Sequence, residues 1–231
     1  MVRYGEIRPC AQLQSFISTF WILEHDGGDA APQRVVPDGH SELILNWSHP
    51  FQFFQRGRWL DQPSCFFAGQ IDGPLLLRPT GAAKMLGIGF HPDGAARLLG
   101  RPVHELSRLF TPVDDLSPSL SRGLHDALHG PDAIAGVEAA LASCANGSCR
   151  SDLVVGEAIA RIERSRGALD VAVLAKELAL STRQLERRIL AEVGLSPKMF
   201  SRIQRFSGVF TALRQPSCNW VETAMSCGYY D

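Results

Sequence analysis

Two short apolar patterns of helical period, separated by a brief polar break, constrain the fold of this chain more than any other feature. The first places four apolar side chains on one helix face at i, i+3, i+4 and i+7, namely Val171, Leu174, Ala175 and Leu178. Asp170 stands where an N-cap belongs. Ser181 and Gln184 then have the spacing of a capping box, which starts a new helix. We therefore predict two helices joined by a turn at Ala179-Leu180-Ser181.

The second of these helices, expected over Thr182–Val193, has one apolar and one charged face. Leu185 and Ile189 point inward, and Gly194 ends the helix. The outward residues are Arg183, Gln184, Glu186, Arg187 and Arg188. Arginine bonds guanine bidentately and glutamine bonds adenine, so this face has the chemistry of a helix that reads the major groove. A solvated face on a helical bundle is the alternative interpretation.

A second unit follows the same plan 49 residues later. Ser196-Pro197 starts a helix of about eighteen residues that Pro216 ends. Its expected buried stripe is Met199, Ile203, Phe206, Phe210 and Leu213. Ala224 and Gly228 are then spaced as Ala175 and Ala179 are, and Asp231 would be the N-cap of a second reading helix.

Charge is distributed unevenly along the chain. The net charge is −1, and residues 1–150 carry 12 basic and 15 acidic side chains. Residues 181–215 carry seven basic and two acidic side chains, among them Lys198. That segment is the part of the chain that would attract an anionic polymer.

The first 90 residues have the short, punctuated apolar runs of β-strands. The expected strands are Gln33–Val36, Glu42–Trp47, Phe51–Gln55, Ser64–Ala68, Leu75–Arg78 and Met85–Phe90, with a hairpin turn at Gly57. Leu13–Leu23 is the one stretch that we expect to be helical. Short strands at even spacing predict a small barrel or sandwich.

Helical spacing begins after Pro92. The expected helices are Ala95–Leu99, Val103–Phe110, Ser119–Leu128 and Asp132–Ser143. Residues 111–116 are expected to form a linker, and the small polar stretch 145–151 marks a domain boundary. We predict an α+β protein, with a β-rich domain over 1–148 that packs helices on a barrel or sandwich, and an all-helical domain over 149–231. The helices after Pro92 suit either dimerisation or packing on the barrel.

The β-rich part offers candidates for a ligand site. Asp38, Glu42 and Trp47 are the expected ligand-binding residues, amid aromatic side chains dense enough to line an apolar pocket or to fill a core. His40-Ser41-Glu42 lacks the paired His-x-His of a metal-binding barrel, so no metal is expected. The sequence has no GxSxG elbow and no glycine-rich phosphate loop. We therefore expect no enzyme, no catalytic residue and no cofactor.

The helical segment resembles the AraC/XylS family of bacterial transcription regulators. The resemblance spans residues 169–231 and is carried by Leu174-Ala175, Leu180 to Arg187, Gly194-Leu195-Ser196-Pro197 and Ala224-(x)2-Cys227-Gly228-Tyr229. It implies double-stranded DNA as partner, with Arg183, Gln184 and Arg187 facing base edges and Glu186 reading cytosine. Arg188 and Lys198 would meet phosphate. Ala179 departs from the family, which usually has glycine at this turn position.

The resemblance also sets expectations for the rest of the chain. Val36–Leu43 and Gly87–Pro92 resemble a subgroup with an uncharacterised β-rich N-terminal domain, which implies a small-molecule effector and a homodimer. The sequence carries no secretory signal and no apolar run of about 20 residues, so a cytoplasmic protein without membrane contact is expected. Because the sequence stops at Asp231, a second hypothesis is a ligand-binding or dimerising fragment with weak or no DNA binding.

Overall fold

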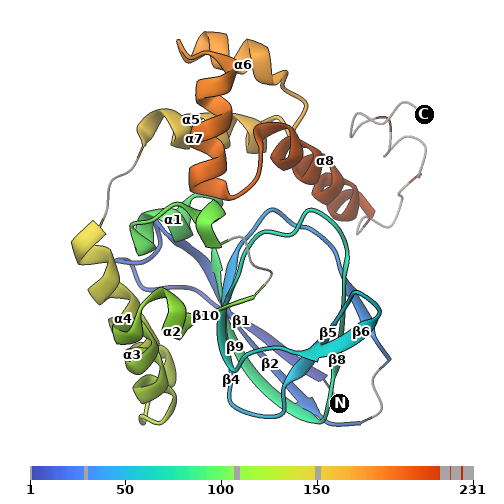
Figure 1. The fold of residues 1–231 in the computed structure, drawn as a ribbon, viewed down its shortest axis with the longest axis vertical. Helices are drawn as coiled ribbons and strands as arrows, with labels where there is room; N and C mark the ends of the chain where they lie inside the picture. Colours follow the sequence, from blue (N-terminus) through green and yellow to red (C-terminus); the bar gives the residue numbers. More distant parts are fainter. Residues whose placement is uncertain are drawn as a thin grey trace.

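The computed structural model describes residues 2–28, 31–106, 110–148 and 152–213, together with residues 219 and 225. It is an α+β protein with two antiparallel sheets followed by helices (Figure 1). The larger sheet has the order β1 (Val2–Ile7), β2 (Ile17–Asp26), β9 (Ala82–Phe90), β4 (Glu42–Asn46), β7 (Cys65–Ala68) and β10 (Thr111–Pro112). The smaller sheet has the order β3 (Gln33–Val35), β8 (Leu75–Pro79), β5 (Phe51–Gln55) and β6 (Arg58–Asp61). The predicted fold class and the six predicted strands are confirmed.

The central strands of the larger sheet, β9, β4 and β7, are buried on both faces. One face packs against the helices that follow it, through residues such as Phe20, Leu43 and Ile88. The other face turns toward the interior between the sheets, where Ile44, Phe66 and Met85 form a second, smaller core with Trp21 and Leu23 packed against it. Alternate side chains of one strand therefore serve two different cores, as strand geometry requires.

The prediction of a helix over Leu13–Leu23 is wrong. Residues 11–16 form turns and Ile17–Asp26 is strand β2, which pairs with β1 on one side and β9 on the other. Because both faces of this strand are covered, apolar residues occur at consecutive positions and the alternation that marks a strand is lost. Strands β1, β6 and β10 were also not predicted.

The middle helices cover the outer face of the larger sheet (Figure 1). They are α1 (Gly94–Leu99), a 3-10 turn η1 (Val103–Leu106), α2 (Val113–Leu116), α3 (Pro118–Leu128) and α4 (Ala133–Ser148). The predicted linker over 111–116 is wrong, because it contains β10 and α2. The stretch 145–151 is not a linker throughout either, since α4 continues to Ser148. The apolar faces of α3 and α4 pack into the core, so packing explains their pattern and the homodimer stays a prediction.

The last helices share a core of their own. They are α5 (Leu153–Arg164), α6 (Val171–Glu177), α7 (Thr182–Val193) and α8 (Pro197–Leu213). Their buried residues, from Val155 to Ile203, belong to a cluster separate from the others. The predicted stripe on α8 is partly wrong, because Phe200 is fully buried whereas Phe210 is 44% exposed. Apart from Asn219 and Met225, the predicted second unit over 219–231 lies outside the described residues.

Glycines mark two of the places where the described helical residues contact the β-rich part. The C-terminal end of α7 packs against α1 and η1, with Gly194 close to Val103. The loop between β3 and β4 meets α8 at Gly39, where a Cβ would lie 2.8 Å from Nε2 of Gln204. Gly39 also has a φ of +88°, which favours glycine, so both its backbone conformation and its close approach to α8 require a residue without a side chain. The opposite end of α7 faces away from the sheets (Figure 1).

Gly87 provides a test of how the larger sheet is packed. The indole of Trp21 lies across this glycine, and a Cβ there would overlap the ring. We expect Gly87→Ala to lower the free energy of unfolding by about 1–3 kcal/mol, as overpacked cores do. Gly5→Ala is the matched control, because its Cβ would meet no described atom within 4 Å. Urea unfolding measures both, and equal effects of the two variants would contradict the packing.

Candidate DNA-binding surface and ligand cavity

The turn between α6 and α7 is fixed by hydrogen bonds that the sequence encodes. The backbone NH of Leu180 donates to the carbonyl of Ala175 (2.9 Å) and that of Ala179 to Lys176 (3.1 Å), which is a Schellman motif. Ala179 takes the left-handed conformation that this motif needs, with a φ of +55°. Ser181 and Gln184 then form the predicted capping box. These hydrogen bonds determine that α7 begins at Thr182.

The first two turns of α7 present charged side chains to solvent. Arg183, Glu186 and Arg187 are exposed, and no salt bridge between described residues engages either arginine. Gln184 is exposed, but its Oε1 accepts hydrogen bonds from the backbone NH and Oγ of Ser181 (2.9 Å each). Adenine recognition needs that oxygen as an acceptor, so in this conformation Gln184 offers only its amide nitrogen.

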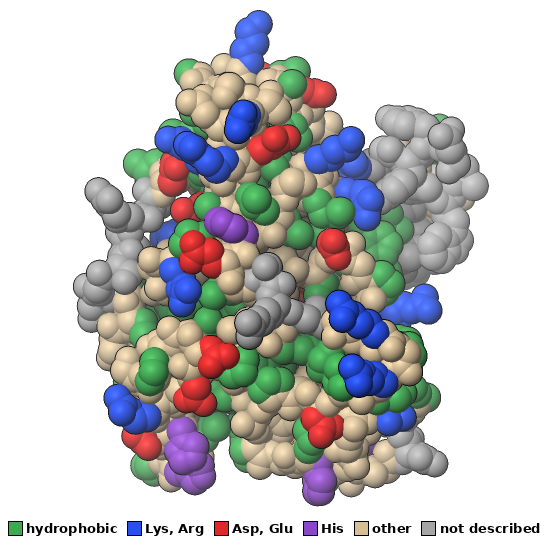
Figure 2. Space-filling model, in the orientation of Figure 1, with side chains coloured by type: hydrophobic (Ala, Val, Ile, Leu, Met, Phe, Trp, Pro, Cys, Tyr) green, Lys and Arg blue, Asp and Glu red, His purple; other side chains and the backbone are tan. Residues whose placement is uncertain are grey.

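The two residues expected at phosphates lie apart from this face. Arg188 is half-buried and pairs with Asp152 (3.5 Å), whose other oxygen caps α5. Lys198 is exposed on the first turn of α8. Figure 2 shows basic side chains over the end of the molecule that holds α6 and α7. Of the six expected DNA contacts, the structure brings Arg183, Gln184, Glu186 and Arg187 together on one helix end.

A hollow opens beside the larger sheet, around Glu42. Its mouth, of about 430 Å³, is lined by residues of β1, β2 and the β3–β4 loop, including Tyr4, Trp21 and Asp38. A narrower cavity of about 90 Å³ continues between the sheets, past Asp38, His40 and Glu42. Val35, Ile44, Leu75, Leu77 and Phe110 give this inner part an apolar lining. Below, "the Glu42 cavity" means the mouth and the inner part together.

Hydrogen bonds position the polar side chains of the Glu42 cavity. Trp21 donates from Nε1 to Oε1 of Glu42 (2.8 Å). Asp38 accepts from the backbone NH of His40 (3.0 Å), the turn that the sequence predicts. Burial raises the pKa of Glu42 and nearby Asp38 raises it further, while the Trp21 hydrogen bond and His40 act in the opposite direction.

Sequence reasoning found part of this cavity. Asp38 and Glu42 line it as expected, whereas Trp47 does not: it is 40% exposed and lies near Lys84, whose Nζ is 5.9 Å from the ring centre. Tyr4 was missed because strand β1 was missed. Trp21 was not singled out among the aromatic side chains, and its hydrogen bond to Glu42 depends on a strand register that no local pattern reveals.

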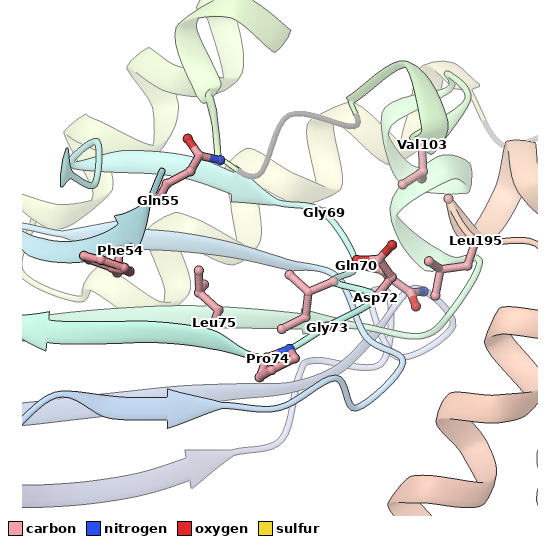
Figure 3. A pocket seen from close by; sticks show the side chains of 12 residues that line it. Phe54, Gln55, Gly69, Gln70, Asp72, Gly73, Pro74, Leu75, Val103 and Leu195 are labelled. Carbon is pink, nitrogen blue, oxygen red and sulfur yellow. The ribbon is translucent and has the colours of Figure 1, made fainter. Parts of the chain in front are cut away.

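A second hollow, of about 500 Å³, lies where the β-rich and helical parts meet (Figure 3). It is lined by the loop 69–75 and β5, by Val103 of η1, and by Gly194 and Leu195 between α7 and α8. Both side-chain polar atoms of Gln70 are buried there without a partner among the described residues. In the described part of the chain, no three His, Cys, Asp or Glu residues lie where they could hold a metal ion, and no helix is long and apolar enough to cross a membrane.

Comparisons with known proteins give one family match and several similar structures. Residues 5–111 match a family described as a domain of unknown function, DUF6597. No curated protein matches the chain. ToxT from Vibrio cholerae is similar at 8% identity over 100% of this chain and 90% of that one, with a TM-score of 0.49. The AraC-like transcriptional activator CuxR is similar at 15% identity over 87% and 84%, with a TM-score of 0.31. The Clostridium difficile EutQ protein is similar at 10% identity over 42% and 67%, with a TM-score of 0.30.

The left-handed Ala179 provides a stability test of the turn. A Cβ is unfavourable at positive φ, so we expect Ala179→Gly to raise the free energy of unfolding by about 1 kcal/mol. Ala160→Gly, in the middle of α5, should lower the free energy of unfolding by about 1 kcal/mol, because glycine is unfavourable inside a helix and Ala160 has no positive φ for it to relieve. Urea unfolding checks both signs, and destabilisation by Ala179→Gly would contradict the turn geometry.

The raised pKa of Glu42 predicts a pH-dependent stability. A carboxyl group whose pKa is raised in the folded state contributes fully to the stability of the fold when the pH is below its ordinary pKa of 4.5. This contribution is lost as the pH rises through the pKa of the folded state. Glu42→Gln keeps the acceptor for Trp21 and removes the buried charge. We expect the variant to be more stable than the natural chain at neutral pH, with a gap that shrinks toward pH 4.5.

Thermal unfolding across this pH range measures the gap between the two proteins. The control is Glu24→Gln, which removes the surface pair with Lys84 (3.1 Å) and should change stability by less than about 1 kcal/mol. A gap for Glu42→Gln that stays constant with pH would contradict the assignment.

Proposed function

We propose that this chain is a sequence-specific DNA-binding regulator of AraC type. In this proposal α7 reads bases in the major groove and the β-rich part receives a small-molecule effector. The observation that carries the proposal is the exposed start of α7, where Arg183 and Arg187 stand one turn apart with no salt-bridge partner among the described residues. Two short helices joined by a fixed turn are how the helix-turn-helix presents its reading helix.

The arrangement of α7 supports access to a duplex. Its C-terminal end rests on η1 and α1, so docking of the helical part leaves the first two turns uncovered. Side chains at i and i+4 of a helix are about 5–6 Å apart, which suits contacts to neighbouring base pairs in one groove. Arg183 and Arg187 are therefore the primary base contacts, and Glu186 faces the same groove as an acceptor for cytosine.

The other candidate residues take different roles. Gln184 supports the helix start, and it contributes to readout through its amide nitrogen or after leaving the capping box. Lys198, exposed at the start of α8, meets phosphate. Arg188 holds α7 to α5 through Asp152, so its contribution to DNA binding is indirect.

The β-rich part is suited to control the helical part. We place the boundary between the two at residues 148 and 149, since the buried clusters on either side share no residue. The loop that carries Asp38 and His40 lines the Glu42 cavity and also touches α8 through Gly39. An effector that moves this loop would therefore also shift its contact with α8, the helix that follows α7.

DNA binding tests the proposal through single arginines. A duplex is first selected from random sequence with the whole chain. We then expect Arg183→Ala and Arg187→Ala each to cost about 1–3 kcal/mol of binding free energy, roughly a fivefold to 150-fold loss of affinity. Lys198→Ala should lower affinity for all sequences alike and reduce the salt dependence by about one phosphate contact. Fluorescence anisotropy measures these affinities.

Arg34→Ala is the matched control, because Arg34 is an exposed arginine on β3, far from the reading helix in sequence. It should leave affinity unchanged. If no sequence is enriched, or if the arginine variants bind as the natural chain does, the chain does not read DNA through α7. A ligand-binding protein without DNA binding would then be the better description.

A further inference from the structure

We propose that the Glu42 cavity binds an organic ammonium ion with a short apolar substituent. The inference rests on the proposed function only in naming this ion as the effector of a DNA-binding regulator. Binding itself depends on the cavity alone.

The charge of the cavity calls for a cation. Its lining includes the carboxyl groups of Glu6, Asp38 and Glu42 and no lysine or arginine. Glu42 is the most enclosed of them, and the one hydrogen bond that its side chain makes with the described residues uses Oε1. Oε2 therefore remains to accept from a ligand. A buried carboxylate without a countercharge is costly, and a bound cation removes that cost.

The hydrogen-bonding groups of the mouth are nearly all acceptors. Three hydroxyls line it, and each one donates its hydrogen bond to another group of the protein. Ser18 Oγ donates to Gly89 O (2.9 Å), Thr19 Oγ1 to Phe20 O (3.0 Å) and Tyr4 Oη to Glu6 Oε1 (2.9 Å). The Nδ1 of His40 lies 2.9 Å from Phe90 O, which can only accept, so Nδ1 carries a proton. In the neutral ring Nε2 then presents a lone pair. A ligand that matches this lining supplies N–H donors.

Aromatic rings flank the acidic groups. Tyr4 and Trp21 are stacked, with their ring centres 6.4 Å apart and their planes 28° from parallel. Ring faces attract cations, most strongly those of tryptophan. Burial and neighbouring Glu6 also raise the pKa of Tyr4 to about 12, so its hydroxyl stays neutral and adds no charge of its own.

The inner part of the cavity limits the apolar substituent. Its volume of about 90 Å³ is bounded by aliphatic side chains and Phe110. That is smaller than a cavity of about 150 Å³, which admits a benzene ring. A propyl or butyl chain fits this space, and a long acyl chain does not.

Four small probes with one butyl chain separate the possible ligand classes. Butylammonium and butyltrimethylammonium carry a positive charge, 1-butanol is neutral and butyrate is negative. The readout is the NMR signal of the Trp21 indole N–H, assigned by its loss in Trp21→Phe. Because this N–H is bonded to Glu42, its shift reports on this cavity and needs no DNA.

We expect both ammonium probes to move the indole signal in a saturable way, and 1-butanol and butyrate to bind at least about tenfold more weakly. Glu42→Gln, which keeps the indole acceptor, should weaken ammonium binding by at least about tenfold. Tyr4→Leu should weaken binding of butyltrimethylammonium by a few-fold. Glu24→Gln, outside the cavity, should leave binding unchanged.

Three results would overturn the proposal. They are equal binding of 1-butanol and the ammonium probes, tighter binding of butyrate, and no saturable shift with any ammonium probe at tens of millimolar. Titration of the selected DNA is run separately on the same protein. Failure of the ligand site and failure of DNA binding are then distinguished by different signals.

Discussion

The turn between α6 and α7 is the constraint on which the functional account depends. Its Schellman hydrogen bonds require a left-handed residue at Ala179, and the capping box at Ser181 starts the next helix two residues later. These two devices determine which α7 side chains face the core and which face solvent. Leu185, Ile189 and Val193 are buried as a result, and Arg183 and Arg187 are exposed. A one-residue shift of the helix start would rotate this arrangement by about 100°.

Local signals predicted the helical part closely. The caps at Asp170, Ser181 and Gly194 depend on neighbouring residues, and each is present. The stripe on α8 was predicted less well, because helical spacing alone does not reveal which face meets the rest of the molecule. Phe200 is buried by α8's packing in the helical core, whereas Phe210 is 44% exposed.

Nonlocal pairing limits what the sequence reveals about the β-rich part. Strand β2 was taken for a helix because apolar residues on both of its faces pack against a core, and β1 offers only exposed residues. The Glu42 cavity brings together residues from β1, β2 and the β3–β4 loop. The hydrogen bond between Trp21 and Glu42 can be predicted only when the strand order β2-β9-β4 is known. Asp38 and Glu42 were predictable as candidates, whereas their aromatic partners and the contact from Gly39 to α8 were not.

Hydrogen–deuterium exchange of the whole chain, with and without its selected duplex, tests the central claim most directly. Amide exchange reports where DNA covers the protein without altering any residue. The account predicts protection concentrated at the start of α7 and at the neighbouring turn, residues 178–188, with none on β1 to β10. Protection on the sheets instead, or unchanged exchange over 178–188 when DNA is bound, would contradict the claim that α7 reads the duplex.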